Sequence, residues 1–276
     1  VETDEEFYCK FIIPHFVYVP EENKLTHLKY IRDFILLKHV EQGYTKKQKQ
    51  VISSMKQWDF IYVGNARRKA SDFVSPFIDV FNEMCKDDEF PPQPFRSKEW
   101  QKFMELAGMV SEVSADKFCQ FAEDLSSKYK TSNTLPDELA RKSKILCEHL
   151  FSHEKLKQNI LHRVSCIEFI PPFEVDLFLG NIFRQHQSRK CPIAFSGSIY
   201  SKYAKLAWTC CPILPDWKFP ITLNEQESLN ILSKPHLKDV ITHTQNICEV
   251  LQKNLQSHGN HHDLDKIDSV MTDIYN

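Results

Sequence analysis

Apolar residues recur every three or four positions along most of this chain, which is the spacing of an amphipathic helix. The clearest case is segment 235–259, which carries on one helical face Leu237, Val240, Ile241, Ile247, Cys248, Leu251 and Leu255. A helix with such a face buries it against a core. Similar spacing predicts helices over residues 3–13, 20–43, 45–57, 75–85, 97–108, 114–130, 136–152 and 263–275. The chain is therefore expected to be mainly helical.

Capping residues indicate where several of these helices begin. A Ser or Thr followed three residues later by Glu or Gln forms a capping box, and this spacing occurs at Thr3–Glu6 and Thr45–Gln48. Ser75 precedes Pro76, and proline is favoured at the first position of a helix. Helices are thus expected to start after Thr3, Thr45, Ser75, Ser97 and Ser114.

A smaller part of the chain has the composition of β-strands. Segment 58–63, WDFIYV, is rich in aromatic and β-branched residues, and further such runs fall within residues 165–221. We predict a helix-dominated α+β fold with a small mixed or antiparallel sheet, strand-rich around residues 165–221. The expected organisation is a single module over residues 1–276, with residues 1–130 and 131–276 as its two candidate subdomains.

Composition argues against several classes of function. The net charge is −2 and the pI is near 6.7, so the attraction that drives non-specific nucleic-acid binding is missing. The six glycines are too far apart for a G-x-G-x-x-G turn or a P-loop. No apolar run approaches the roughly 18 residues of a membrane helix. We expect no cofactor, no nucleic acid and no membrane insertion. Because the chain begins with Val1, it is expected to be a fragment without a visible targeting segment.

The nine cysteines include one adjacent pair, Cys210–Cys211, and show no C-x-x-C spacing. A long chain with an ample core does not need a disulfide framework, so reduced cysteines and a cytoplasmic location are expected. The pair lies in KLAWTCCPIL, residues 205–214, which is interpreted as a strand whose neighbouring side chains point to opposite faces. We expect both thiols to be packed structurally. The alternative is a cysteine- or histidine-dependent enzyme that uses Cys210 or Cys211.

Two groups of histidines have a spacing that invites comparison with metal sites. His149 and His153 are four residues apart on one helical face, and the second group is His258, His261 and His262. The first group lacks the glutamate of an H-E-x-x-H motif, and the second falls in a polar connector. Neither is expected to bind a metal, and no catalytic set of residues is predicted.

Two segments are candidates for contacts with protein partners. FPPQPF, at residues 90–95, combines aromatic and proline side chains, and ARRK, at residues 66–69, is a short basic cluster. Exposed aromatic clusters mark docking grooves, although FPPQPF also suits a rigid turn. The basic cluster also suits a solvated surface. The partner-binding residues predicted from both segments are Arg67, Arg68, Phe90, Pro91, Pro92 and Phe95.

Four segments combine unusual proline and tryptophan patterns. In chain order they are WDFIYVGNARRKASDFVSPFIDVFNEM, FPPQPFRSKEWQKFMELAGMVSEVSADKFCQFAEDL, FSGSIYSKYAKLAWTCCPILPDWKFP and KPHLKDVITHTQNIC. They contain an FPP-x-PF turn, a WT-x-x-PILP-x-W element and a helix with H-x-x-NIC. In order and spacing these segments resemble the internal repeat of the sacsin family. The stretches GNARRKA, SP and LAGM depart from that pattern, so the chain resembles a divergent copy.

The resemblance implies a function. The family consists of very large, chaperone-like cytosolic proteins, so it implies a non-catalytic structural and interaction module of such a protein. The implied partners are client chains and neighbouring modules of the same chain. The resemblance also implies a parent that acts as a co-chaperone regulating the seventy-kilodalton heat-shock machinery. The glycine signatures of the family's ATP-binding module are absent from this sequence, so ATP binding is not expected.

Overall fold

The computed structural model describes residues 3–37, 43–131, 137–171 and 192–258. Contacts along the chain divide it into two compact units, Val1–Val113 and Ser114–Asn276, and each unit is described by itself. Helices dominate, and the described residues contain one two-stranded antiparallel sheet, so the predicted helix-dominated α+β class is confirmed. The single module with candidate subdomains 1–130 and 131–276 stays a prediction.

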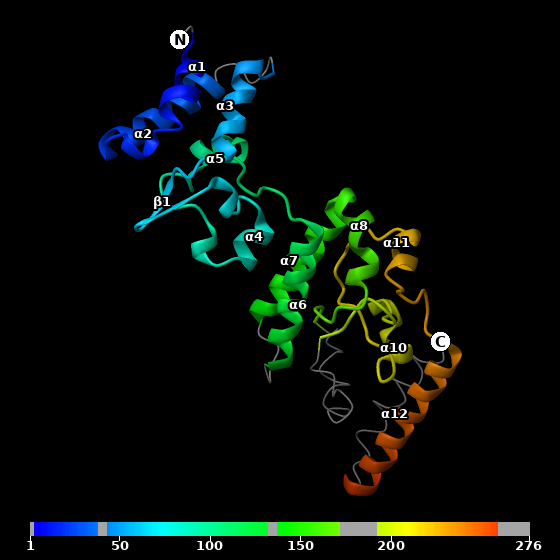
Figure 1. Cartoon of the computed structure of the whole chain (residues 1–276). Helices are drawn as coiled ribbons and strands as arrows, with labels where there is room; N and C mark the ends of the chain where they lie inside the picture. Colours follow the sequence, from blue (N-terminus) through cyan, green and yellow to red (C-terminus); the bar gives the residue numbers. More distant parts are fainter. Residues whose placement is uncertain (1–2, 38–42, 132–136, 172–191, 259–276) are drawn as a thin grey trace. The chain divides into compact units, whose positions relative to one another are not determined.

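The first unit is a group of short helices followed by a hairpin and two further helices (Figure 1). Two of the helices, α1 and α2, continue into the π-helical segments η1 and η3. In chain order the helical elements are α1 (Asp4–Phe7), η1 (Tyr8–Ile12), η2 (Phe16–Tyr18), α2 (Glu21–Tyr30), η3 (Ile31–Leu36), α3 (Lys46–Lys56), η5 (Ala70–Asp72), α4 (Asp79–Met84), η6 (Asp87–Glu89) and α5 (Lys98–Leu106).

The capping predictions are confirmed where the signal is local. The Thr45 hydroxyl accepts the N–H of Gln48, and the Gln48 side chain accepts the N–H of Thr45 in return. At Ser75 the prediction is wrong, because α4 begins only at Asp79. The N–H of Ser75 donates to the carbonyl of Val110 at 2.9 Å, which keeps this residue extended beside a distant segment.

The sheet of the first unit is a hairpin of β1 (Ile61–Val63) and β2 (Ala66–Arg68). Its two-residue loop begins with Gly64 at φ +59°, the position where a type II′ turn requires glycine. The register pairs Ile61 with Arg68 and Tyr62 with Arg67, and paired residues share a face of the sheet. Ile61 is buried, so its face packs on the core, whereas on the opposite face Tyr62 is half-buried and Arg67 is exposed.

The core of the first unit is built largely from aromatic rings. Trp100 on α5 is 1% exposed and meets Phe95 and Phe103 edge to face, with ring centroids 5.2 Å and 5.1 Å away. The guanidinium of the buried Arg32 lies over the Trp100 ring at 4.4 Å and forms an ion pair with Glu99 at 2.6 Å. The buried cation is thus neutralised by Glu99 on α5 together with the adjacent Asp33, whose carboxylate accepts two hydrogen bonds from it at 2.6 Å and 2.9 Å.

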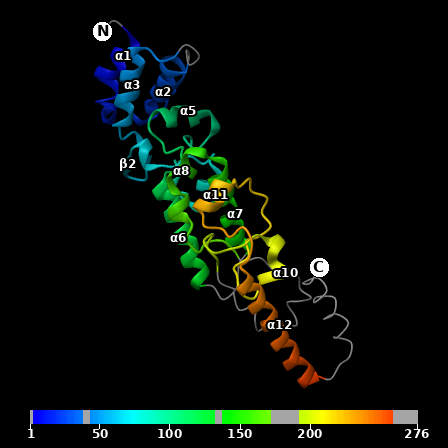
Figure 2. The same ribbon diagram turned by 90° about the vertical axis from the view of Figure 1, so that its right-hand side faces the viewer.

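The second unit begins with three packed helices, α6 (Ala115–Thr131), α7 (Asp137–Ser152) and α8 (Glu154–Val164), which lie side by side (Figure 1, Figure 2). The buried Ser143 hydroxyl on α7 is 3.1 Å from the hydroxyl of Tyr129 and 2.6 Å from the carbonyl of Phe169. It therefore joins α6, α7 and the segment after α8. Further along the chain are η7 (Ser201–Tyr203), α10 (Ala204–Ala207), α11 (Leu223–Ser228) and α12 (Leu237–His258).

The prediction that residues 165–221 are rich in strands is wrong for the described part of that stretch. Its described residues form only isolated bridges, such as Ile170–Ile193 and Ile199–Ile213. KLAWTCCPIL is a short helix and a turn, since the N–H groups of Cys210 and Cys211 both donate to the carbonyl of Ala207. A short apolar run is typical both of a buried strand and of a buried helix or turn, so the sequence alone did not distinguish them here. The helix expected at 263–275 lies outside the described residues.

Candidate interaction site

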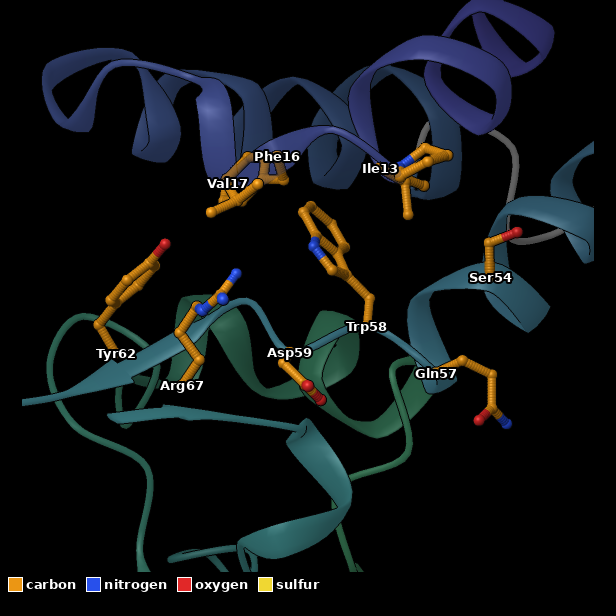
Figure 3. Close-up of a pocket in the computed structure, with 10 residues that line it drawn as sticks. Ile13, Phe16, Val17, Ser54, Gln57, Trp58, Asp59, Tyr62 and Arg67 are labelled. Carbon is orange, nitrogen blue, oxygen red and sulfur yellow. The ribbon is translucent and has the colours of Figure 1, made fainter. Parts of the chain in front are cut away.

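A hollow of about 280 Å³ opens on the first unit between its N-terminal helices and the hairpin (Figure 3). We call it the Trp58 hollow. It is lined by Ile13, Pro14, Phe16, Val17, Ser54, Gln57, Trp58, Asp59, Tyr62 and Arg67. Its lining comes from segments far apart in the sequence, so it exists only in the folded unit.

Aromatic rings form the floor of the Trp58 hollow. The N–H of Trp58 donates to the carbonyl of Met55, a bond that ends α3 and turns the chain toward β1. Its indole meets Phe16 at 90° with ring centroids 4.4 Å apart and contacts Phe60 at 5.0 Å. Val17, on the rim, is 45% exposed. The hollow therefore has a rigid aromatic floor, of which only a small part is exposed, and an accessible apolar edge at Val17.

Tyr62 is held in place by a buried lysine. The Lys24 ammonium donates to the Tyr62 hydroxyl at 2.7 Å, lies 4.3 Å from the centre of its ring, and also forms an ion pair with Glu21. Burial acts to lower the pKa of Lys24, but the hydrogen bonds to Glu21 and Tyr62 outweigh it and raise the pKa above its ordinary value. Lys24 is thus charged at neutral pH and fixes the phenol.

The two arginines of the basic cluster have different surroundings because neighbouring residues on a strand face opposite ways. Arg68 lies with its guanidinium 4.3 Å from the Phe73 ring and donates to the carbonyls of Asp72 and Asp88. Arg67 is exposed and points, beside Tyr62, into the Trp58 hollow (Figure 3). Among the described residues, Arg67 forms no ion pair.

The aromatic and proline residues of FPPQPF are mostly interior. Phe90, Pro91 and Phe95 are buried and Pro92 is half-buried. Phe95 packs on Trp100, and the Arg96 guanidinium covers the Phe90 ring at 4.8 Å. A groove at residues 90–95 would have little apolar surface to offer. Of the six residues predicted for partner binding, Arg67 is the one that lines the Trp58 hollow.

A second hollow, of about 470 Å³, lies on the second unit between α7 and residues 216–220. Phe151 and Phe219 stack there with ring centroids 5.2 Å apart. Lys144 and Glu148, which both line it, form an ion pair at 3.8 Å. Because these two charges neutralise one another, they do not indicate whether a ligand of this hollow would be an anion or a cation. The Trp58 hollow is the more informative of the two.

The residues around Cys210 form a polar clasp on α12, which contacts α10 (Figure 2). The Thr209 hydroxyl lies 2.8 Å from Nδ1 of the fully buried His243, and Asn246 donates to that hydroxyl at 3.1 Å. The N–H of Thr209 also points to this Nδ1, at 3.4 Å. The WT-x-x-P pattern, through Thr209, and the H-x-x-N pattern, through His243 and Asn246, thus contact one another in the folded unit.

The cysteine pair is part of this packing. Asn246 Nδ2 is 3.7 Å from the Cys210 sulfur, and Cys211 is buried in a cluster with Ile199, Ala207 and Ile213. The rings of His149 and His153 stack at 3.9 Å, although α7 ends between them at Ser152. In the described part of the chain, no three His, Cys, Asp or Glu side chains gather as a metal ligand set. His261 and His262 lie outside that part.

Comparison with known proteins gives one clear relative. In an alignment 289 positions long, which covers 90% of the chain, the chain is 26% identical to human sacsin. The chain is related to sacsin. The aligned region is 6% of the length of sacsin, which supports the prediction that this sacsin-related chain is one module of a large protein. No family model matches the chain, and no solved structure gives a significant match.

None of the described helices of this sacsin-related chain has both the length and the apolar character needed to cross a bilayer.

Removing the hydroxyl at the centre of the clasp is expected to destabilise this sacsin-related module. Thr209→Val keeps the side-chain shape but leaves His243 and Asn246 without their shared partner, at a cost of about 1–3 kcal/mol in the free energy of unfolding. Denaturant titration measures the change. Thr242→Val is the matched control, because Thr242 is exposed and its hydroxyl donates to the carbonyl of Lys238, one turn earlier on α12. Equal stability of the two variants would contradict the structural role of the clasp.

Proposed function

We propose that this chain is a non-catalytic interaction module of a large, chaperone-like, sacsin-related protein, and that the Trp58 hollow receives a side chain of a protein partner. The observation that carries the proposal is the aromatic floor of Trp58 and Phe16, open at the exposed edge of Val17. Rigid aromatic surfaces of this kind are typical of residues that dominate binding energy at protein interfaces. The partners we propose are client chains or neighbouring modules.

Two further observations support a non-catalytic role in the cytoplasm. The thiols that an enzyme would use belong to packing, since Cys210 is bonded within the clasp and Cys211 is 7% exposed. The cysteines of the described residues are all free thiols, which suits a reducing compartment. A co-chaperone role for the parent protein in the seventy-kilodalton heat-shock system is the wider part of the proposal, and it rests on the relation to sacsin.

The proposal is tested with a permanently unfolded, reduced and alkylated model protein as the client. Its addition is expected to shift the indole N–H resonance of Trp58, assigned with Trp58→Phe, in a two-dimensional amide spectrum. Val17→Asp is expected to weaken this binding by about tenfold or more, since burial of one apolar side chain supplies roughly that much affinity.

Phe34→Asp is the matched control. Phe34 is also an exposed apolar residue of the first unit, at 58%, but it does not line the hollow. This variant should bind the client as the unchanged chain does. Binding that is insensitive to Val17→Asp, or equally sensitive to both changes, would reject the Trp58 hollow as the site.

A further inference from the structure

The Trp58 hollow carries a positive charge that no described group of the chain neutralises. Arg67 is exposed and makes no ion pair among the described residues, whereas the nearby cations Lys24 and Arg68 are engaged by Glu21, Tyr62 and backbone carbonyls. The Asp59 carboxylate also lines the hollow, but it points away from Arg67 (Figure 3). The guanidinium is therefore available to an anion at the mouth of the hollow.

A second donor lies beside this cation. The Lys24 ammonium can only donate, so the Tyr62 hydroxyl accepts the 2.7 Å bond between them and keeps its own proton to donate. Tyr62 and Arg67 are cross-strand partners, and their side chains point the same way (Figure 3). A guanidinium next to a hydroxyl matches the two oxygens of a carboxylate.

The rest of the hollow is small, and its lining is mixed, with Ser54, Gln57 and Asp59 beside the apolar residues. At about 280 Å³ it lies below the roughly 300–1,000 Å³ of sites for drug-sized ligands, so it suits one side chain better than a cofactor. Trp58, Phe16 and Val17 supply the contacts for that side chain. A ligand that binds both to the donors Arg67 and Tyr62 and to the apolar residues has a carboxylate and a large apolar group close together.

We infer that the Trp58 hollow recognises an extended peptide segment in which an Asp or Glu stands two residues from a large apolar side chain. Residues two apart on an extended chain point the same way and lie about 7 Å from one another, so both can enter the hollow together. Arg67 and Tyr62 bind the carboxylate, and Trp58 and Phe16 contact the apolar group. This inference rests on the proposed function, because it names the partner for the same hollow.

Three labelled peptides that differ at one position test the inference by fluorescence anisotropy. Each contains Phe two residues before Glu, Gln or Lys, among serines. The Glu peptide is expected to bind about tenfold more tightly than the Gln peptide at low salt, and the Lys peptide least. In Arg67→Glu the order is expected to reverse, and binding of the Lys peptide shows that this variant is folded.

Lys49→Glu is the control for net charge, since Lys49 is exposed on α3 and does not line the hollow. It should leave the preference for Glu unchanged. Equal binding of the Glu and Gln peptides, or a preference for Glu that survives Arg67→Glu, overturns the inference and leaves the proposed function standing. If neither the peptides nor the unfolded client shift the Trp58 resonance, the proposed function fails as well.

Discussion

Replacing Trp100 by alanine is expected to lower the free energy of unfolding of the first unit by about 3–5 kcal/mol. The indole is 1% exposed and packs edge to face against Phe95 and Phe103, so its removal leaves a cavity in the aromatic core. It also removes the ring over which the buried Arg32 guanidinium lies at 4.4 Å. Denaturant titration, with amide hydrogen exchange in α5 as the local readout, measures the loss.

Two variants separate cavity formation from other effects of this change. Phe34→Ala removes an exposed ring of the same unit and is expected to change stability by less than about 1 kcal/mol. Trp100→Phe retains part of the packing and should fall between Trp100→Ala and the unchanged chain. A Trp100→Ala chain as stable as Phe34→Ala would show that the aromatic core contributes far less than its burial indicates.

The sequence predicts those features of the fold that depend on neighbours along the chain. Thr45 and Gln48 cap α3 as expected, because both partners of the capping box lie within one turn. The start of α4 was not predictable in this way, since Ser75 is held by the carbonyl of Val110, far along the chain. A capping residue indicates a helix start only when no distant partner competes for its backbone.

In the candidate site, too, the features that depend on sequence neighbours were predictable and those that depend on distant residues were not. Alternation along the hairpin, with glycine at its loop, is enough to send Arg67 and Arg68 to opposite faces, so the sequence holds the signal for that distinction. The roles of Trp58 and Tyr62 were missed, because they depend on Phe16 and Lys24 from segments about forty residues earlier. FPPQPF was recognised as unusual, and the structure shows its rings packed inside.

In the second unit, removing the charge of Lys157 is expected to cost about 3 kcal/mol in the free energy of unfolding. Lys157 on α8 forms an ion pair at 2.6 Å with Glu225 on α11, and the two side chains are only 12% and 11% exposed. Lys157→Met leaves the Glu225 carboxylate mostly buried without its counter-charge. Lys144→Met, which breaks a half-exposed pair with Glu148, is the control and should cost about 0–1 kcal/mol.

The double variant Lys157→Met with Glu225→Gln is expected to recover most of the loss, because the glutamine leaves no buried unpaired charge and can still accept the N–H of Thr222. Glu154, the other partner of Lys157 at 2.8 Å, keeps its charge but is 68% exposed, so losing the lysine costs it little. Burial acts to raise the pKa of Glu225, but the bonds from Lys157 and Thr222 outweigh it and hold the pKa below its ordinary value. The stability from this carboxylate is therefore complete above the ordinary pKa of Glu and is lost as pH falls through the lowered one. The stability advantage of the unchanged chain over the double variant should shrink across that acidic range, as denaturant titrations at several pH values would measure. If the double variant is no more stable than Lys157→Met, the cost comes from lost packing of the lysine side chain and the electrostatic account is wrong.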